Sequence, residues 1–161
     1  MDFHITPMTP HAAEAIDQWH YQGLCAFYDL DQDSADREAF LNPDTWGERL
    51  YAVVSEDQDL IGFFSFDHEA DTITLGLGLH PDYTGRGLGN SFVQAGLDFA
   101  DQAFRPARFK LSVATFNRRA IRVYEQLGFT VEHVFLQQTN GGEYEFVEMS
   151  RPAQVDEKTT S

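Results

Sequence analysis

Gly85-Arg86-Gly87-Leu88-Gly89 is the stretch from which the fold of this chain can be inferred. An apolar run, Ile73 to Leu79, precedes it and is closed by His80-Pro81, and a segment with helical periodicity, Leu88 to Phe104, follows it. A strand that turns through glycines into a helix places several backbone N–H groups at the helix N-terminus, where they bind anions, most often phosphates. The stretch therefore predicts a site for a cofactor that carries a pyrophosphate.

The spacing of these glycines excludes the common nucleotide-binding motifs. It is G-x-G-x-G rather than the dinucleotide motif G-x-G-x-x-G, and no Gly-Lys-Ser or Gly-Lys-Thr follows, as a P-loop requires. Glycines also occur in tight turns that merely reverse the chain, and that alternative stays open. The functional interpretation is a short nest of N–H groups with Arg86 beside it, which suits a pyrophosphate.

Two further glycines, Gly76 and Gly78, lie inside the apolar run before the loop. Glycine within a strand often marks a bulge or a ligand that approaches the backbone closely. A bulge would splay this strand from its neighbour and leave the N–H and C=O groups of Leu77 and Leu79 to pair with an extended, amide-bearing ligand. Coenzyme A carries a pyrophosphate at one end and an amide-bearing arm at the other, so it fits both features.

The length and composition are those of one globular domain. The chain has 161 residues, of which 42% are hydrophobic, and we expect a single domain over residues 1–151 with a polar, disordered tail over residues 152–161. No apolar run approaches the roughly 18 residues of a membrane span, and the N-terminus does not resemble a signal peptide. A cytoplasmic protein without a membrane segment is therefore expected.

Cysteine and histidine usage gives no sign of a metal site. Cys25 is the only cysteine, so an internal disulfide is excluded, and we expect a small buried side chain rather than a nucleophile. The six histidines show no metal-ligand spacing such as H-x-x-x-H on a helix. The sequence accordingly predicts no metal cofactor.

The net charge of −15 is distributed unevenly along the chain. Residues 1–80 hold 16 acidic and two basic residues, a sum of −14, whereas residues 86–122 hold seven basic and two acidic residues, a sum of +5. An acidic surface repels nucleic acid, so no nucleic-acid partner is expected. The acidity either serves solubility alone or favours a cationic acceptor such as an amine, while the basic half suits an anionic cofactor.

The expected order of elements is β-α-α-β-β-β-α-β-α-β-β, which is typical of an α+β fold with a mixed sheet and not of the strict alternation of a Rossmann domain. Residues 21–33 are expected to be irregular. The expected strands are residues 3–8, 49–55, 60–68, 71–80, 109–114, 130–137 and 143–150, and the expected helices are residues 10–19, 34–41, 88–104 and 117–127.

Two stretches carry a resemblance to a known family. Residues 77–90 and residues 117–129, in this order and at this separation, resemble the cofactor motifs of the GNAT superfamily of N-acetyltransferases, and the resemblance covers about residues 48 to 150. It implies a mainly antiparallel central sheet flanked by helices, with a splayed strand at the cofactor site. It also implies acetyl-CoA as co-substrate and direct transfer of an acetyl group to a primary amine in a ternary complex. The residues that it implies for cofactor binding are Leu77, Gly78, Leu79, Gly85, Arg86, Gly87, Leu88, Gly89, Asn90, Asn117 and Tyr124.

The resemblance also implies chemical roles. Tyr124 would be the general acid toward the departing CoA sulfur, and the N–H of Leu79 would polarise the thioester carbonyl. A phenol near pKa 10 and a thiol near 8.5 are close enough to share a proton. Tyr124 follows Asn117 by two helical turns, so both lie on one helix face. Asn117 can cap this helix and still contact the pantetheine arm.

The chain departs from the family pattern at two positions. Thr84 stands where the family usually has Gln or Arg, so one pyrophosphate contact is replaced by a hydroxyl or lost. The chain distantly resembles the ribosomal-protein alanine acetyltransferases, but Ser112 stands where those enzymes carry a glutamate base. The general base is therefore not identified; His80 and Tyr83 lie nearby, and a water chain is the alternative.

Aromatic and acidic residues gather in the N-terminal part, where they form either the lip of the acceptor site or a solvated loop anchored by core aromatics. The segment 139–148 would be the hairpin that borders this acceptor groove. Two alternative functions stay open: a non-catalytic acyl-CoA-binding or regulatory module, and a subunit whose partner supplies the acceptor site. The chain is expected to be a monomer or a homodimer. The residues expected at the acceptor lip are Trp19, His20, Tyr21, Phe27, Tyr28, Asp29 and Asp31.

Overall fold

The computed structural model describes residues 2–20, 34–139 and 142–153. Its helices and strands follow the order expected from the sequence, and the α+β fold is confirmed. Two short 3-10 turns, η3 (Pro43–Thr45) and η4 (Pro81–Tyr83), lie between them. The elements are β1 His4–Pro7, α1 Pro10–Asp17, α2 Ser34–Leu41, β2 Leu50–Val54, β3 Leu60–Glu69, β4 Thr72–Leu79, α3 Gly89–Phe104, β5 Arg108–Ala114, α4 Arg118–Gln126, β6 Thr130–Thr139 and β7 Gly142–Pro152.

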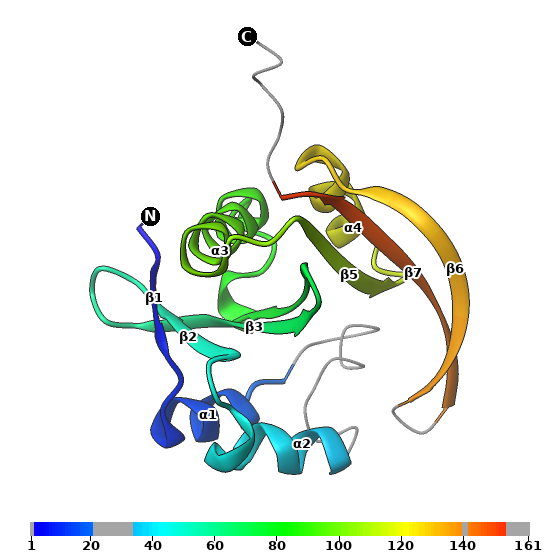
Figure 1. Cartoon of the computed structure of the whole chain (residues 1–161). Coiled ribbons are helices and arrows are strands. Elements are labelled where there is room, and N and C mark those ends of the chain that lie inside the picture. The colour runs from blue at the N-terminus through cyan, green and yellow to red at the C-terminus, as the bar shows by residue number, and fades with distance from the viewer. Residues whose placement is uncertain (1, 21–33, 140–141, 154–161) are drawn as a thin grey trace, which may run out of the picture.

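The strands form one seven-stranded sheet in the order β1-β2-β3-β4-β5-β7-β6. Only β4 and β5 run parallel; the other neighbouring strands are antiparallel. Helices α3 and α4 cover one face of the sheet, and α1 and α2 lie on the other (Figure 1). The core between the sheet and α3 holds the fully buried side chains Phe64, Phe66, Phe92 and Leu97.

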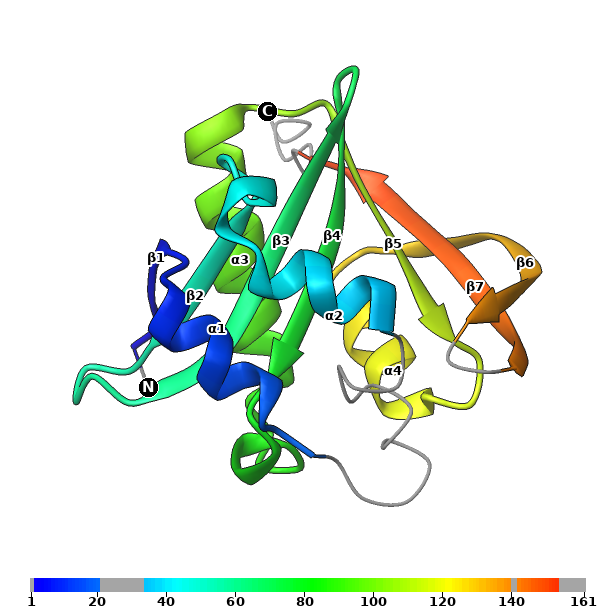
Figure 2. The same ribbon diagram turned by 90° about the horizontal axis from the view of Figure 1, so that it is seen from below.

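The parallel strands β4 and β5 separate partway along their length, as Figure 2 shows. Their ladder holds three residue pairs and ends at Thr74 and Lys110, although β4 continues to Leu79 and β5 to Ala114. The expected splayed strand is therefore present, between β4 and β5.

The expected bulge in β4 is wrong. The ladder between β3 and β4 runs without a register shift from Glu69 and Thr72 to Gly62 and Leu79. Cross-strand packing explains the two glycines instead: a Cβ on Gly76 would lie 2.4 Å from Ser65 Oγ, and one on Gly78 would lie 2.3 Å from the Phe63 ring. Beyond the end of its ladder with β4, β5 stays paired with β7, as it is along its whole length.

The C-terminal end of the fold extends past the expected domain boundary at residue 151. Strand β7 ends at Pro152, and Ala153 is buried and donates its amide to Ala107. Buried Arg151 donates to the carbonyl of Leu127 at the end of α4, which a guanidinium suits because the helix ends there in unpaired carbonyls. The expected tail lies, from residue 154, outside the described residues.

A bidentate ion pair joins α1 to α2. The Arg37 guanidinium donates to both carboxylate oxygens of Asp17, at 2.8 and 2.9 Å, and the Asp17 side chain is only 6% exposed. This hydrogen bonding lowers the pKa of Asp17. The pair therefore holds together the two helices on the sheet face opposite α3.

We expect Asp17→Asn to lower the free energy of unfolding by about 1–3 kcal/mol, because the substitution removes the charge of a buried carboxylate that is hydrogen-bonded to a partly exposed guanidinium. The folded-state pKa of Asp17 lies below its unfolded value. The contribution of the pair is therefore complete above the unfolded pKa, near 4, and is lost as the pH falls through the folded value. Urea titrations at pH 7 and at acidic pH measure both effects.

The matched control is Asp67→Asn, which removes an ion pair with Arg49 whose side chains are 51% and 39% exposed. Exposed pairs contribute at most about 1 kcal/mol. Equal losses for the two variants at pH 7 would contradict the structural role given to the α1–α2 pair.

Candidate cofactor site

The glycine loop takes a backbone conformation that explains its three glycines. Gly85 and Gly87 both have φ of +75°, in the left-handed region where a Cβ is disfavoured. Gly89 begins α3, where a Cβ would lie 3.1 Å from the Val123 side chain on α4. The first two glycines shape the loop, and the third lets α3 and α4 pack closely.

Helix α3 presents its N-terminus to this loop. Leu88 is the N-cap residue and makes no side-chain hydrogen bond to the first turn. The first amide groups of an α-helix lack partners within the helix, and they carry its positive dipole end. The loop and the helix end therefore have the geometry that suits an anion, and the pyrophosphate site stays a prediction.

Two side chains of the loop are already engaged. The Thr84 hydroxyl donates to the carbonyl of Pro81 at 2.8 Å, so its hydrogen is not directed at an anion in the loop. Arg86 is exposed, with its guanidinium 5.2 Å above the Tyr83 ring. Of the two outcomes left open for Thr84, this geometry favours the loss of a contact.

A further cation, Arg119 on α4, lies at the loop. A Cβ on Gly85 would stand 3.4 Å from Nη1 of this exposed arginine. Arg119 was not among the expected site residues, although the basic excess over residues 86–122 includes it. Only the packing of α4 against the loop singles it out within that excess.

Asn90, an expected cofactor residue, bridges two helices. Its side-chain amide donates to Gln126 Oε1 at 2.9 Å, which links α3 to α4 on an exposed surface. The contact fixes the two helices behind the loop.

The residues of β4 alternate between its two edges. The amide of His80 donates to the carbonyl of Ile61, so Gly78 and the other even-numbered residues direct their peptide groups toward β3. Leu77 and Leu79 direct theirs toward the opposite edge, where β5 has separated. That edge is the one at which the sequence predicts an extended ligand.

Asn117 and Tyr124 lie at the start and in the last turn of α4, the helix that follows β5. Asn117 is the N-cap of α4, and its side chain accepts the amide of Ala120 at 3.2 Å. Tyr124 is 7% exposed and packs edge-on against Phe129, with 6.0 Å between the ring centroids. Helix α4 begins at Arg118, shortly after β5 ends at Ala114.

His80 has a structural function at the turn after β4. Its Nδ1 accepts the amide of Asp82 at 3.0 Å, so the neutral imidazole carries its proton on Nε2. In this arrangement the Nδ1 lone pair is engaged by the Asp82 amide and Nε2 bears a hydrogen, so neither nitrogen is ready to take a proton from an amine. Its ring packs against Trp19 from the acceptor lip, at 4.8 Å, and against Tyr83, at 5.8 Å.

Of the remaining expected site residues, some lie in the part of the chain that the structure describes and others lie outside it. Ser112 is exposed on β5 opposite Glu148 of β7, and the β6–β7 hairpin forms with Thr139 paired to Gly142. Cys25 and the lip residues in the range 21–31 lie outside the described residues. Within the described ranges, no three His, Cys, Asp or Glu side chains gather as a metal site. No helix in that part of the chain is long and apolar enough to cross a membrane.

A model of the acetyltransferase (GNAT) family matches residues 14–129, which is more than half of the chain. No curated protein matches the sequence.

Among solved structures, spermidine N-acetyltransferase from Vibrio cholerae, in complex with CoA and spermine, is similar, with a TM-score of 0.75 at 16% identity over 94% of this chain and 95% of that one. A GNAT-family acetyltransferase from Bacillus anthracis has a TM-score of 0.73 at 17% identity, over 95% of this chain and 96% of that one. Ribosomal-protein-S5-alanine acetyltransferase from Vibrio fischeri has a TM-score of 0.68 at 17% identity, over 96% and 94% of the two chains. At these identities the likeness is one of fold.

Proposed function

Because this chain belongs to the acetyltransferase (GNAT) family, we propose that it binds acetyl-CoA and transfers the acetyl group directly to a primary amine. The enzyme class, acyltransferase, follows from the family. One observation carries the proposal: the loop with left-handed Gly85 and Gly87 leads into the N-terminus of α3, beside the opening between β4 and β5. The loop would bind the pyrophosphate of coenzyme A, and the opening between the strands beside it would take the amide-bearing arm.

The residues of this chain would bind the cofactor at three places. The amides of the loop and of Leu88, Gly89 and the rest of the first turn of α3 would bind the pyrophosphate. The edge of β4 at Leu77 and Leu79 would pair with the amide-bearing arm. Asn117 would contact the same arm from α4. When bound, the cofactor supplies the acetyl group as a thioester.

The chain's own groups would then stabilise the charge that develops on the thioester carbonyl and transfer the protons of the reaction. The amide of Leu79 would polarise the thioester carbonyl, as oxyanion-stabilising donors do. The Tyr124 hydroxyl would give its proton to the departing sulfur. The amine must be neutral to attack. The hydrogen bond at Nδ1 of His80 argues against that imidazole as the base, so Tyr83 and a water chain are the remaining routes for the amine proton.

The acceptor is proposed to be an amine that is protonated, and therefore cationic, when it is free in solution at neutral pH. The charge sum of −14 over residues 1–80 favours such a molecule electrostatically. The Vibrio cholerae enzyme is named for spermidine, itself a cationic amine, which agrees with this proposal without establishing it for this chain.

A titration with acetyl-CoA tests the cofactor assignment. A ligand that binds only the folded state raises the melting temperature, by an amount that grows with the ratio of ligand concentration to Kd. We expect a clear rise at acetyl-CoA concentrations of about a millimolar. No rise would refute the assignment, while a rise without turnover of any amine would favour the non-catalytic acyl-CoA-binding module.

Arg119 is proposed to supply a cationic contact to the phosphates of CoA, where the Thr84 hydroxyl is engaged elsewhere. We expect Arg119→Gln to raise the Kd of CoA about 10-fold, as the loss of one hydrogen bond to a charged group predicts. Calorimetric titration with CoA measures this. The control Arg122→Gln removes a charge from the same helix; an equal effect of both variants would assign the loss to net charge and contradict the contact.

A further inference from the structure

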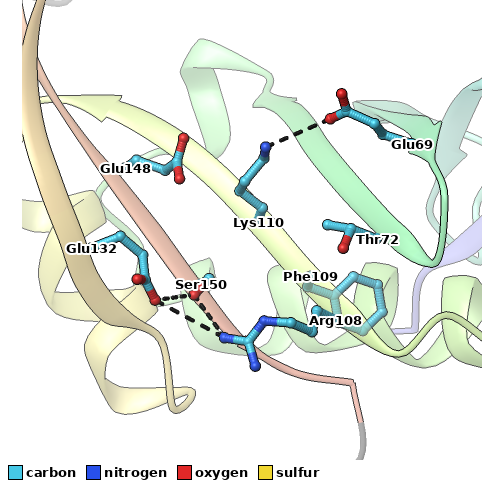
Figure 3. A pocket seen from close by; sticks show the side chains of 8 residues that line it. All are labelled: Glu69, Thr72, Arg108, Phe109, Lys110, Glu132, Glu148 and Ser150. Carbon is cyan, nitrogen blue, oxygen red and sulfur yellow. Dashed lines mark hydrogen bonds and ion pairs between the residues drawn. The ribbon is translucent and has the colours of Figure 1, made fainter.

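A pocket of about 470 Å³ opens on the sheet face opposite α3, where β4, β5, β7 and β6 follow one another (Figure 3). Helices α1 and α2 lie over the other half of this face, as Figure 2 shows. Three carboxylates and two cations line the pocket, together with Ser150: Glu69, Glu132, Glu148, Arg108 and Lys110.

Both cations of the pocket have partners within it. Lys110 Nζ lies 3.7 Å from the carboxylate of Glu69. Arg108 donates to the Ser150 hydroxyl at 2.9 Å and stands 4.0 Å from Glu132, which accepts the hydrogen bond of that same hydroxyl. Neither cation is therefore left to neutralise a third carboxylate.

Glu148 is that third carboxylate. It is half-buried and makes no hydrogen bond or ion pair with any other residue of the described ranges, and Figure 3 draws it without an interaction. The lining side chains thus carry one unbalanced negative charge, located on Glu148. A carboxylate that no cation or donor of the protein satisfies is open to a cationic ligand.

The register of the strands relates Glu148 to the opening between β4 and β5. Lys110 is the last residue of β5 that pairs with β4, through Thr74. Ser112, the next residue of β5 on the same face, pairs with Glu148. Glu148 therefore lies at the end of the pocket where the two strands begin to separate.

We propose that this pocket is the distal part of the acceptor site, and that Glu148 binds the second ammonium group of an aliphatic diamine or polyamine. The inference rests on the proposed function. The reacting amine would enter the opening toward Leu79, and the rest of the acceptor would run along the open face past Ser112 to Glu148.

The distance along the strands suits a short diamine. Glu148 is level with Gly76, three residues from Leu79, because β4 and β5 pair at Thr74 and Lys110. Three strand residues span about 10 Å, and β7 lies about 5 Å beyond β5 across the sheet. The glutamate side chain and its hydrogen bond to the ammonium group shorten this separation. An extended four-carbon diamine spans about 6 Å between its nitrogens, at roughly 1.2 Å per bond.

The test compares 1,4-diaminobutane with 1-aminobutane, which lacks the second ammonium group, as acceptors with saturating acetyl-CoA. We expect Glu148→Gln to raise the KM for 1,4-diaminobutane at least about 10-fold, as the loss of a charged hydrogen bond predicts, with kcat changed far less. The KM for 1-aminobutane should stay within about twofold, since it never reaches Glu148. The matched control Glu48→Gln removes the same charge from an exposed side chain before β2 that does not line the pocket, and it should change neither KM.

Three results would overturn the inference. An unchanged KM for the diamine would show that Glu148 does not bind it, and equal losses for both amines would assign Glu148 to the reacting amine or to folding. If the wild-type chain acetylates neither amine, the proposed function fails for amines of this kind. Calorimetry of 1,4-diaminobutane with the CoA-saturated protein then still decides the pocket, because binding abolished by Glu148→Gln supports it and absent binding refutes it.

Discussion

Replacing Tyr124 with phenylalanine is expected to lower kcat by a factor of roughly 10² to 10⁴, the usual contribution of a general acid. The substitution removes one hydroxyl from a side chain that is otherwise packed against Phe129 in the core. The ring and its packing remain, so the fold and the affinity for CoA should be retained. Steady-state thiol release gives kcat, and calorimetry gives the Kd of CoA.

The control for this experiment is Tyr51→Phe, the same chemical change at another ring that packs against the core. Tyr51 lies on β2, and its hydroxyl donates to the carbonyl of Glu48. The control should keep its kcat within a few-fold. An unchanged kcat in Tyr124→Phe would remove this tyrosine from the mechanism, and a large rise in the Kd of CoA would assign it a binding function instead.

Replacing Gly87 with valine is expected to raise the Kd of CoA by more than about 10-fold. The φ of +75° at this residue suits glycine, whereas a residue with a Cβ loses about 1–2 kcal/mol there, and a β-branched one more. No atom lies within 4 Å of the position of the new Cβ, so the effect comes from the backbone and not from a clash. A loop that relaxes to negative φ turns its amides away from the anion.

Gly47→Val is the matched control. Gly47 also has a positive φ, +51°, and open space around its Cβ position, but it lies before β2, outside the glycine loop. We expect a similar loss of unfolding free energy in both variants and a loss of CoA affinity only for Gly87→Val. Equal CoA affinity in the two variants would contradict the assignment of the loop as the pyrophosphate site.

The order of the elements was predictable because each carries its own local signal. The G-x-G-x-G loop, the cap at Asn117 and the stop at Gly128 mark the ends of helices whatever their partners are. The two glycines of β4 were misinterpreted for the same reason. A strand glycine reports a close approach but not its source, and here the source is the Phe63 ring and the Ser65 side chain on the neighbouring strand.

Other features depend on tertiary packing that a single sequence does not reveal. The position of Arg119 at the loop requires α4 to pack against Gly85. The isolation of Glu148 depends on a register that places both cations of its pocket beside other partners. Likewise, Asp17 and Arg37 are 20 residues apart, and a separation of this kind does not predict from the sequence that the two residues pair.

Acetyl-CoA-dependent thiol release in the presence of single amines tests the central claim most directly. The panel should include polyamines, amino acids, aminoglycosides and peptide N-termini, with mass spectrometry of the product. The account predicts that at least one cationic amine gains one acetyl group for each thiol released, and that Tyr124→Phe slows both together. Acetyl-CoA binding without acetylation of any amine, or acetylation of anionic amines alone, would contradict it.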